Sequence, residues 1–519
     1  MTSITICPPA TNHPGDDIVW NPARVDTRLF AEAGNLILVR PGAAYRLDQR
    51  ISLGDGVTVK GANPIVMPAD QSIIPVADPS NMAVFASGPT TPSARKDNSK
   101  TGGFRLENAD CATLQDIFLQ GYAGIDYLKA TNCQTTRVCI DHKIGDAWAW
   151  FQQTGAFFQH EGCNGNTFSS CFTRAQHHGF LNHDGGWVKN TTFRDCRAID
   201  CGCGKESDGS GYLDWSVGFD LAEQCDVDGV TVDSCYAAKN GKVGFYFEPE
   251  DTGNADRKAP YIRKNIHLLN CLGVDNGKYG GGMLGQMRIK EGEQCNYLVA
   301  SGHLENCISV RGAKAGFYAR QEFNVDPLVY DNCIDISSNR GFVLELAGAS
   351  ATYNNCIAYE PKVCGVQLMG SGPVRFTGKV QVSNGAEAFH LGGYLRVYDM
   401  ESRDGNNTRL QQATAKEDWW PVKGLSINAQ VAGTRTPWVK HSGTVVDTSN
   451  VKVIFVPTFD EPAWGYIAAT PATDPIQPPI TPPVVPIATV PTEEAGEEDP
   501  VAKTLTIYYS DGSNKVIAL

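Results

Sequence analysis

The stretch LENCISVRGAKAGFYAR, residues 304–320, repeats a pattern that the chain has already used in VDSCYAAKNGKVGFYFE, residues 232–248. In both stretches a small polar residue precedes a cysteine, and Gly-Phe-Tyr begins nine residues after that cysteine. Shorter versions place a glycine and an apolar residue eight or nine residues after a cysteine, at Cys171, Cys333 and Cys356. Cysteine is therefore a fixed point of an internal repeat.

The spacing of these cysteines indicates the fold. Eight cysteines from Cys139 to Cys356 form one column, and their successive spacings are 32, 25, 39, 36, 36, 26 and 23 residues. One coil of a right-handed parallel β-helix takes roughly 23–26 residues. Longer spacings then hold loops inserted into single coils. Alternating apolar residues in GVTVKG, NTTFRDC and NIHLLNC favour strands. We predict an all-β chain, a right-handed parallel β-helix (solenoid), with this cysteine column: Cys139, Cys171, Cys196, Cys235, Cys271, Cys307, Cys333 and Cys356.

Most of the seventeen cysteines are expected to be buried thiols. Cysteine is small and weakly polar, so equivalent residues of stacked coils can form a ladder inside a narrow solenoid. The polar residue before each cysteine could bond turn backbone in adjacent coils. A second, less regular column introduces the same strands. It contains Cys111, Cys133, Cys163, Cys225 and Cys295. Cys7, Cys201 and Cys203 are the candidates for exposed thiols or interchain disulfides.

The stretch LILVRPGAAYRLDQRISLGDGVTVKGAN, residues 36–63, resembles the opening coils of the pectate-lyase-like β-helix superfamily. That superfamily includes polysaccharide lyases, polygalacturonases, alginate epimerases and bacteriophage tailspikes. With the cysteine repeat, the resemblance covers about residues 34–400 and implies a fold more than a chemistry. MRIKEG, residues 287–292, contains the Arg-Ile-Lys of polygalacturonases, but their Asn-Thr-Asp and Gly-His-Gly motifs are absent.

The remaining sequence divides the chain into further parts. Residues 1–33 are expected to lead into the β-helix or cap it, because an open solenoid end exposes strand edges. Residues 401–470 lose the repeat and suggest a small β-rich module or closing coils. Residues 471–500 contain nine prolines and end in EEAGEEDP, which predicts a semi-rigid acidic linker. Residues 501–519 are typical of a terminal β-hairpin that turns at Asp511-Gly512.

Composition excludes some classes of partner. The net charge of −13 argues against a nucleic-acid partner, although a local basic groove could still bind an anionic polysaccharide. The sequence contains no run of 18 apolar residues, so no membrane span is predicted. The first 17 residues lack the basic and apolar regions of a signal peptide, so we expect synthesis in a cytosol or earlier removal of a leader.

A candidate site follows from aligning the strands after each Gly-Phe, namely GFLNHDGG, GFDLAEQC, GFYFEPED, GQMRIKEG, GFYARQEF and GFVLELAG. If each phenylalanine points inward, alternate residues point outward. They would form a polar, aromatic sheet face beside the longest inserted loops, suited to sugars. The substrate-binding candidates are His183, Tyr246, Arg288, Tyr318 and Arg320, and the catalytic candidates are Asp220, Glu248, Asp251 and Lys290.

Three uses of this face compete. Hydrolysis would use carboxylates from Asp220, Glu248 and Asp251. Elimination or epimerisation would use Lys290, Tyr246 or His183 as the base, with Arg288 or Arg320 neutralising a uronate. The third use is binding without turnover. No cofactor and no metal site are predicted, because no third ligand accompanies the pair His177-His178, which is interpreted as turn structure.

The main functional hypothesis is a bacteriophage virion appendage, a spike or fibre of tail, neck or head that binds and could cleave host surface polysaccharide. Its expected partners are that glycan, other virion proteins and further copies of the chain, with a trimer favoured. It would be made in the host cytoplasm and act in the virion. The alternative is a free extracellular polysaccharide lyase, epimerase or glycoside hydrolase.

Overall fold

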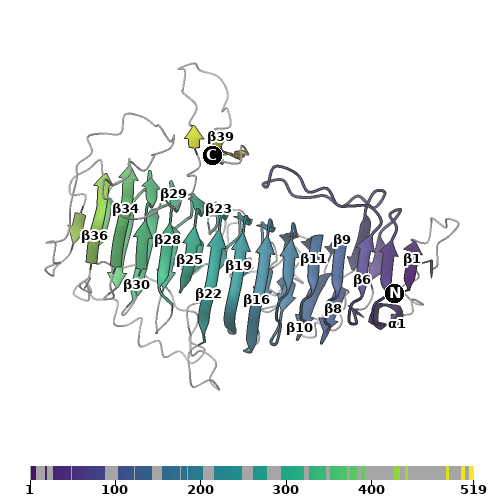
Figure 1. Cartoon of the computed structure of the whole chain (residues 1–519). Coiled ribbons are helices and arrows are strands. Elements are labelled where there is room, and N and C mark those ends of the chain that lie inside the picture. Colours follow the sequence, from purple (N-terminus) through teal and green to yellow (C-terminus); the bar gives the residue numbers. More distant parts are fainter. Residues whose placement is uncertain are drawn as a thin grey trace, which may run out of the picture.

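The chain forms a row of parallel strands that coil about one long axis in the computed structural model (Figure 1). The structure describes residues 2–7, 18–19, 27–47, 50–87, 103–121, 123–142, 155–175, 177–183, 185–202, 216–247, 261–277, 294–320, 326–346, 351–370, 374–383, 387–391, 425–432, 439–441, 487–489, 504–508 and 514–518. Side chains are described within these ranges as far as Gln367, except at 18–19, 320, 345–346 and 364. The predicted parallel β-helix is confirmed.

Each complete coil contributes strands to three faces, and equivalent strands of successive coils pair in parallel. The first and second faces belong to one 24-stranded sheet, and the third face is a 13-stranded sheet. The long strands β9 (Thr113–Gly121), β11 (Gln134–His142) and β34 (Val374–Ser383) run through both the first and the second face.

The first face begins with the N-terminal strands β1 (Ser3–Cys7) and β2 (Ile18–Val19), and β1 pairs with β3. Its other strands are β3 (Leu36–Val39), β6 (Thr58–Gly61), β13 (Thr167–Ser169), β16 (Trp187–Arg194), β19 (Asp226–Asp233), β22 (Arg263–Leu269), β25 (Gly302–Glu305), β28 (Leu328–Asp331), β31 (Ala351–Asn354) and β36 (Leu425–Ala432).

The second face consists of short strands. They are β4 (Tyr45–Leu47), β7 (Ala83–Ser87), β14 (Phe172–Arg174), β17 (Arg197–Ile199), β20 (Tyr236–Ala238), β23 (Leu272–Val274), β26 (Ile308–Val310), β29 (Ile334–Ile336) and β32 (Ile357–Tyr359).

The third face carries the predicted site. Its strands are β5 (Arg50–Ser52), β8 (Gly103–Glu107), β10 (Gly124–Leu128), β12 (Gly155–Gln159), β15 (His178–Asn182), β18 (Val217–Asp220), β21 (Val243–Tyr246), β24 (Cys295–Val299), β27 (Ala315–Arg320), β30 (Arg340–Leu346), β33 (Cys364–Gly370), β35 (Glu387–Leu391) and β37 (Val439–His441).

One residue with left-handed backbone makes the corner between the first and second faces. Its φ lies near +50° in coil after coil, as at Ser234, Asn270 and Asn306. Asn and Asp tolerate this conformation better than most residues, which explains why a polar residue precedes the cysteine. The side chains also bond along the ladder, since Asn306 Nδ2 donates to Asn270 Oδ1 at 3.3 Å. The predicted bonding to turn backbone is replaced here by bonding between side chains.

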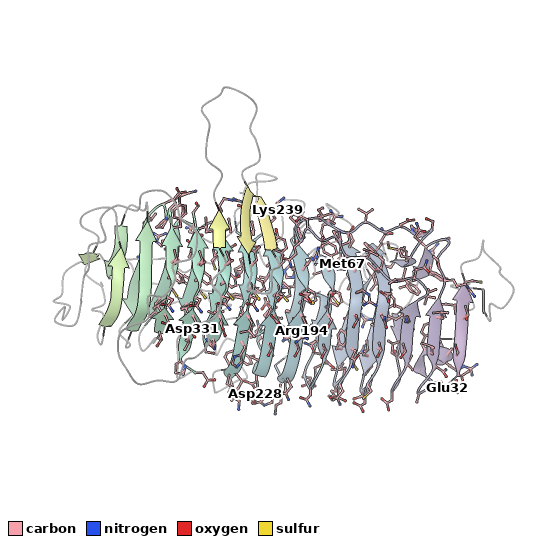
Figure 2. All side chains as sticks on the ribbon, turned by 45° about the horizontal axis from the view of Figure 1, so that its top comes forward. Glu32, Met67, Arg194, Asp228, Lys239 and Asp331 are labelled. Carbon is pink, nitrogen blue, oxygen red and sulfur yellow. The ribbon has the colours of Figure 1, made fainter. Side chains whose placement is uncertain are left out.

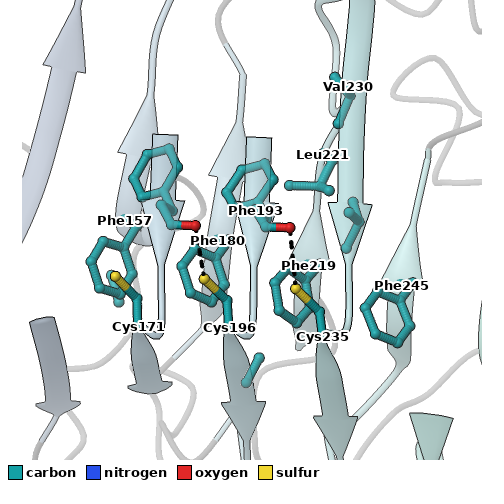
Figure 3. Close-up of a cluster of buried hydrophobic side chains, with 14 of the residues drawn as sticks. Phe157, Cys171, Phe180, Phe193, Cys196, Phe219, Leu221, Val230, Cys235 and Phe245 are labelled. Carbon is teal, nitrogen blue, oxygen red and sulfur yellow. Dashed lines mark hydrogen bonds between the residues drawn. The ribbon is translucent and has the colours of Figure 1, made fainter. Parts of the chain in front are cut away.

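The cysteine after each corner points into the solenoid. Each thiol donates to a carbonyl oxygen of the preceding coil, for example Cys196 Sγ to Phe168 O at 3.4 Å and Cys235 Sγ to Phe193 O at 3.5 Å (Figure 3). Cys139 was predicted in this column and is the exception. It pairs with Phe172, one residue beyond the interior position, and packs in a cluster outside the coil.

Aromatic rings stack beside this ladder on the inner side of the third face (Figure 3). Neighbouring ring centres lie 4.6–5.0 Å apart, close to the spacing of the coils. Stacking of this kind adds to the burial of apolar surface and aligns successive coils. The column contains Phe157, Phe180, Phe219, Phe245, Tyr297, Phe317 and Phe342.

Residues 62–82 cross the outer side of the second face and cover part of it (Figure 2). Ile65 and Met67 pack in a cluster with Phe118 and Phe172, which point out of the solenoid. The guanidinium of Arg197 donates to the carbonyl oxygens of Pro68 and Asp70, at 2.8 and 3.2 Å, and so fixes the crossing segment.

The two ends of the chain add further elements. Helix α1 (Arg28–Ala31) places Phe30 against the first coils of the core. β36 and β37 extend the sheets in parallel beyond residue 400. The predicted terminal hairpin is present, because β39 (Thr504–Tyr508) pairs antiparallel with β40 (Asn514–Ala518), and β38 (Ile487–Thr489) joins them. None of the described helices has the length and apolarity needed to span a membrane.

The prediction of exposed thiols was wrong for two of three cysteines. Cys7 and Cys201 are buried, because each packs against neighbouring coils rather than in an open loop. Cys203 lies outside the described residues. Among the described cysteines the exposed one is Cys111, which sits in a left-handed turn before β9.

Thiol labelling of the native chain should reflect this arrangement. Among the described cysteines we expect rapid reaction at Cys111 alone, with Cys235, Cys307 and Cys333 reacting only after denaturation, because reagent cannot reach the interior. Peptide mapping after a short pulse of iodoacetamide measures this, with Cys111→Ser as the control. Rapid native labelling of Cys307 would contradict the ladder.

Candidate functional site

Three of the predicted site residues, Asp220, Tyr246 and Tyr318, lie on the third face in the predicted register, although one strand between them was assigned to the wrong segment. Asp220 of β18 pairs with Tyr246 of β21, one coil further on. Tyr246 pairs with Leu298, which in turn pairs with Tyr318, so Tyr318 lies two coils beyond Tyr246 as predicted. The intervening strand is β24, CNYLV, rather than the predicted GQMRIKEG. Glu248, Asp251, Arg288 and Lys290 lie outside the described residues.

The described residues on the outer side of this face around β18, β21 and β27 are buried, whereas the sequence predicted an outward-pointing polar and aromatic face. Phe317 points inward as expected, while Tyr246 and Tyr318 point to the opposite side. Both tyrosines are nevertheless fully buried, in an outer cluster that consists of Val217, Val243, Tyr246, Cys295, Leu298, Ala315, Tyr318 and Val343. The alternation of a strand indicates which side a residue faces, but not whether other chain covers that side. Arg320 ends β27, and its side chain is outside the description.

Ionisable side chains gather next to this outer cluster. His178 begins β15, Asp220 ends β18, and Glu223 follows three residues later. His178 Nδ1 lies 3.3 Å from Asp220 Oδ2, and His178 Nε2 lies 3.5 Å from Glu223 Oε2. All three side chains are buried, as is His183, which follows β15. We call His178, Asp220 and Glu223 the carboxylate–imidazole cluster.

A lysine and a second histidine adjoin the carboxylate–imidazole cluster. Lys242 precedes β21 and is buried, with its Nζ 5.4 Å from the centre of the Tyr246 ring. Burial, together with the smaller effect of the charge of Lys242, lowers the pKa of His177 to about 3. Burial also holds the pKa of His178 well below 6.5, and His177, His183 and Lys242 act in the same direction. Neutral imidazoles therefore face ionisable groups from neighbouring coils.

Sequence reasoning found three members of this region, His183, Asp220 and Tyr246, but missed His178, Glu223 and Lys242. His178 was interpreted as turn structure because no further ligand stands near it in the sequence. The partners of His178 come from the next coil, more than 40 residues later. The position of His178 in the repeat could have found it. His178 directly precedes a Gly-Phe pair, as Val217 and Val243 do, and those two valines lie in the outer cluster.

The arrangement brings together groups of the kind that acid–base catalysis uses. Two carboxylates can act as acid, base or nucleophile, and a buried ammonium group can neutralise an anionic sugar or transition state. Burying so many ionisable groups is costly unless they serve each other or a ligand. Perturbed groups of this kind concentrate at functional sites.

Comparison with known proteins adds little beyond the fold. No protein-family model matches the chain, and no curated protein matches it. Among solved structures, the catalytic unit of a GH87 α-1,3-glucanase from Streptomyces thermodiastaticus is similar at 12% identity, with a TM-score of 0.40 over 80% of this chain and 66% of that one. This chain spans 63% of the length of another GH87 α-1,3-glucanase catalytic domain, in complex with nigerose, at a TM-score of 0.42 and 12% identity.

Two further similar structures have other activities in their names. A rhamnogalacturonan lyase is 12% identical, with a TM-score of 0.35 over 88% of this chain and 87% of that one. The A-module of an Azotobacter vinelandii mannuronan C-5 epimerase is 12% identical, with a TM-score of 0.34 over 69% and 88% of the two chains. All these scores lie below 0.5, so the similarities assign no substrate and no residue role to this chain.

Proposed function

We propose that this chain is a virion appendage of a bacteriophage, whose β-helix binds a host surface polysaccharide and acts on it at the third face. The observation that carries the catalytic part is the convergence of His178, Asp220, Glu223 and Lys242 from three successive coils. Structural roles alone would favour apolar residues at such buried positions, as at the neighbouring Val217 and Val243.

Substrate must reach groups that are now buried. Asp220 and Tyr246 have no exposed surface, so a sugar can contact them only after a change in the chain that covers them. The longest insertions in the sequence fall between Cys196 and Gly218, between Glu248 and Cys271, and between Cys271 and Gly285, and we propose that they wall a cleft beside this face. Glu248, Asp251, Arg288 and Lys290 stay candidates for substrate contact.

The appendage part of the proposal is supported by the organisation of the C-terminal region. A proline-rich acidic stretch precedes a short antiparallel hairpin. With β38 it forms a sheet of only three short strands, and we expect this small sheet to dock onto other copies or other virion proteins, with a homotrimer favoured. The alternative, a free extracellular lyase, epimerase or hydrolase, predicts a monomer.

The test is turnover of host capsular and lipopolysaccharide glycans by the full chain. Reducing ends report hydrolysis, and absorbance near 232 nm reports the unsaturated uronate of an elimination. We expect Glu223→Gln and Lys242→Met each to reduce turnover by about 100-fold or more, the usual range for acid–base groups, without abolishing polymer binding.

The control variant is Lys264→Met, a lysine on the first face that pairs with Asp228 at 3.1 Å and should leave turnover unchanged. Binding without turnover in the wild type would reduce the proposal to a glycan-binding spike. A monomeric chain by light scattering, with rapid turnover, would favour the free enzyme. If the chain binds none of the host glycans, both the glycan-binding spike and the enzyme that acts on these glycans are overturned.

A further inference from the structure

The buried imidazole of His178 makes no hydrogen bond, although both of its nitrogens face carboxylates. The His178 side chain has no exposed surface, so water cannot satisfy these nitrogens from outside. An imidazolium held by two carboxylates would be expected to hydrogen-bond to them at about 2.7–2.9 Å. The observed separations are 3.3 and 3.5 Å, and neither has hydrogen-bond geometry. A buried polar group in this state calls for a ligand.

The donor atoms of the carboxylate–imidazole cluster are close enough to share one ion. One ligand atom from each of His178, Asp220 and Glu223 lies within 4.8 Å of the other two. Their scaffold is rigid, because β15 and β18 are paired strands of adjacent coils. Glu223 is held by its own backbone, whose N–H donates to Asn182 O at 3.0 Å. Small side-chain rotations would bring the three donors to about 2.0–2.2 Å from a common centre.

The chemistry of the donors selects the kind of ion. One imidazole nitrogen and two carboxylate oxygens suit Zn²⁺ or Mn²⁺, whereas Ca²⁺ prefers six to eight oxygen ligands. Coordination would use the lone pair of a neutral imidazole, and burial favours that form of His178. Lys242 lies near enough to repel a cation, but two carboxylates outweigh one ammonium group.

From this geometry we infer that His178, Asp220 and Glu223 bind one divalent transition-metal ion, of the Zn²⁺ or Mn²⁺ class, on the outer side of the third face. The ion would satisfy one imidazole nitrogen of His178, would be neutralised by the two carboxylates, and would tie β15 to β18. This inference goes beyond the proposed function, because an ion that joins two coils stabilises the solenoid whether or not a polysaccharide is processed.

The test measures metal retention and stability in the absence of any glycan. The full chain is treated with EDTA, dialysed, loaded with MnCl₂ or ZnCl₂ and dialysed again before elemental analysis and thermal melting. We expect close to one retained Mn²⁺ per chain and a Tm that rises by several degrees, with no comparable effect of Mg²⁺. Mn²⁺ is the more informative probe, because seventeen cysteines could hold Zn²⁺ elsewhere and Mn²⁺ prefers oxygen ligands.

Variants assign the site. His178→Ala and Glu223→Gln should each lower Mn²⁺ affinity at least tenfold and remove the Tm increase. Glu223→Gln preserves volume, so it remains informative if His178→Ala does not fold. The control is His303→Ala, because His303 pairs with Asp331 on the first face and should retain the ion. Stoichiometric Mn²⁺ in both cluster variants, or none in the wild type, would overturn the inference; either result is independent of turnover.

Discussion

Replacing Asp335 by asparagine is expected to raise the Tm of the chain at pH 8 and to change it little at pH 4. Asp335 lies in the middle of β29 and points into the solenoid with no exposed surface. Its Oδ1 accepts hydrogen bonds from Ser309 Oγ at 2.7 Å and Ser338 Oγ at 2.6 Å. Its Oδ2 has no hydrogen-bond partner.

Asp335 ends a chain of hydrogen bonds inside the corner between the second and third faces. Asn240 Nδ2 donates to Asn276 Oδ1, Asn276 Nδ2 to Asn296 Oδ1, and Asn296 Nδ2 to Ser309 Oγ, at 2.8–2.9 Å. Ser309 then donates to Asp335. An amide continues this ladder of neutral groups, whereas a carboxylate adds a buried charge at its end.

The direction of the pH effect follows from the pKa. Burial raises the pKa of Asp335 to about 7, against the hydrogen bonds from the two serines, which lower it. Between about pH 4 and 7 the unfolded chain has released this proton and the folded chain has kept it, so stability falls as pH rises. Three pKa units correspond to about 4 kcal/mol, which the buried carboxyl of Asp335 costs the folded chain at pH 8 and a neutral asparagine does not.

Melting curves of wild type and Asp335→Asn from pH 4 to 8 measure this effect. Asp331→Asn is a control of opposite sign. Hydrogen bonding to His303 lowers the pKa of Asp331, so its contribution is present above about pH 4 and lost in acid. Because that pair is partly exposed, its loss should cost less than about 1 kcal/mol. A lower Tm of Asp335→Asn at pH 8 would contradict the buried-charge account.

Replacing Phe317 by alanine is expected to destabilise the chain by about 3–5 kcal/mol, as large-to-small changes in a core do. The Phe317 ring stacks on Tyr297 and Phe342, with ring centres 4.6 and 4.9 Å away, and meets the edge of Tyr330 at 5.7 Å. Its loss would interrupt the aromatic column between two coils and leave a cavity that the stacked strands cannot close.

Tyr318, the residue after Phe317, distinguishes a third face that is open to solvent from one that is covered. An open groove predicts that Tyr318→Ala leaves the Tm unchanged, whereas the outer cluster predicts a clear loss, because Tyr318 is fully buried. Tyr318→Phe should be neutral or stabilising by up to about 1 kcal/mol, since the buried hydroxyl has no hydrogen-bond partner.

Thermal melting of the three variants beside Thr231→Ala, a partly exposed position on β19, measures these effects. If Tyr318→Ala melts with the wild type, the cluster is open in solution. If Phe317→Ala melts at the wild-type temperature, the Phe317 side chain does not point into the solenoid.

The repeat itself was visible in the sequence, because the physics that produces it is local. A left-handed corner favours Asn, Asp or Ser, the next residue must be small enough for a narrow interior, and strand alternation then orients the Gly-Phe segment. These requirements recur in each coil, so the fold and the pairing of Asp220 with Tyr246 could be predicted. Cys139 was misplaced because Arg137 makes its corner and Val138 fills the interior position there.

The site was decided by contacts between coils, which no local pattern records. His178 meets Asp220 and Glu223 only because inserted segments of different length still return the chain to the same strand register. Burial of Tyr246 and Tyr318 likewise depends on what covers the third face, and strand alternation is the same for a covered face and an open one. Sequence therefore determined the coil and the direction of its side chains, while tertiary structure decided which side chains meet and which are closed off from solvent.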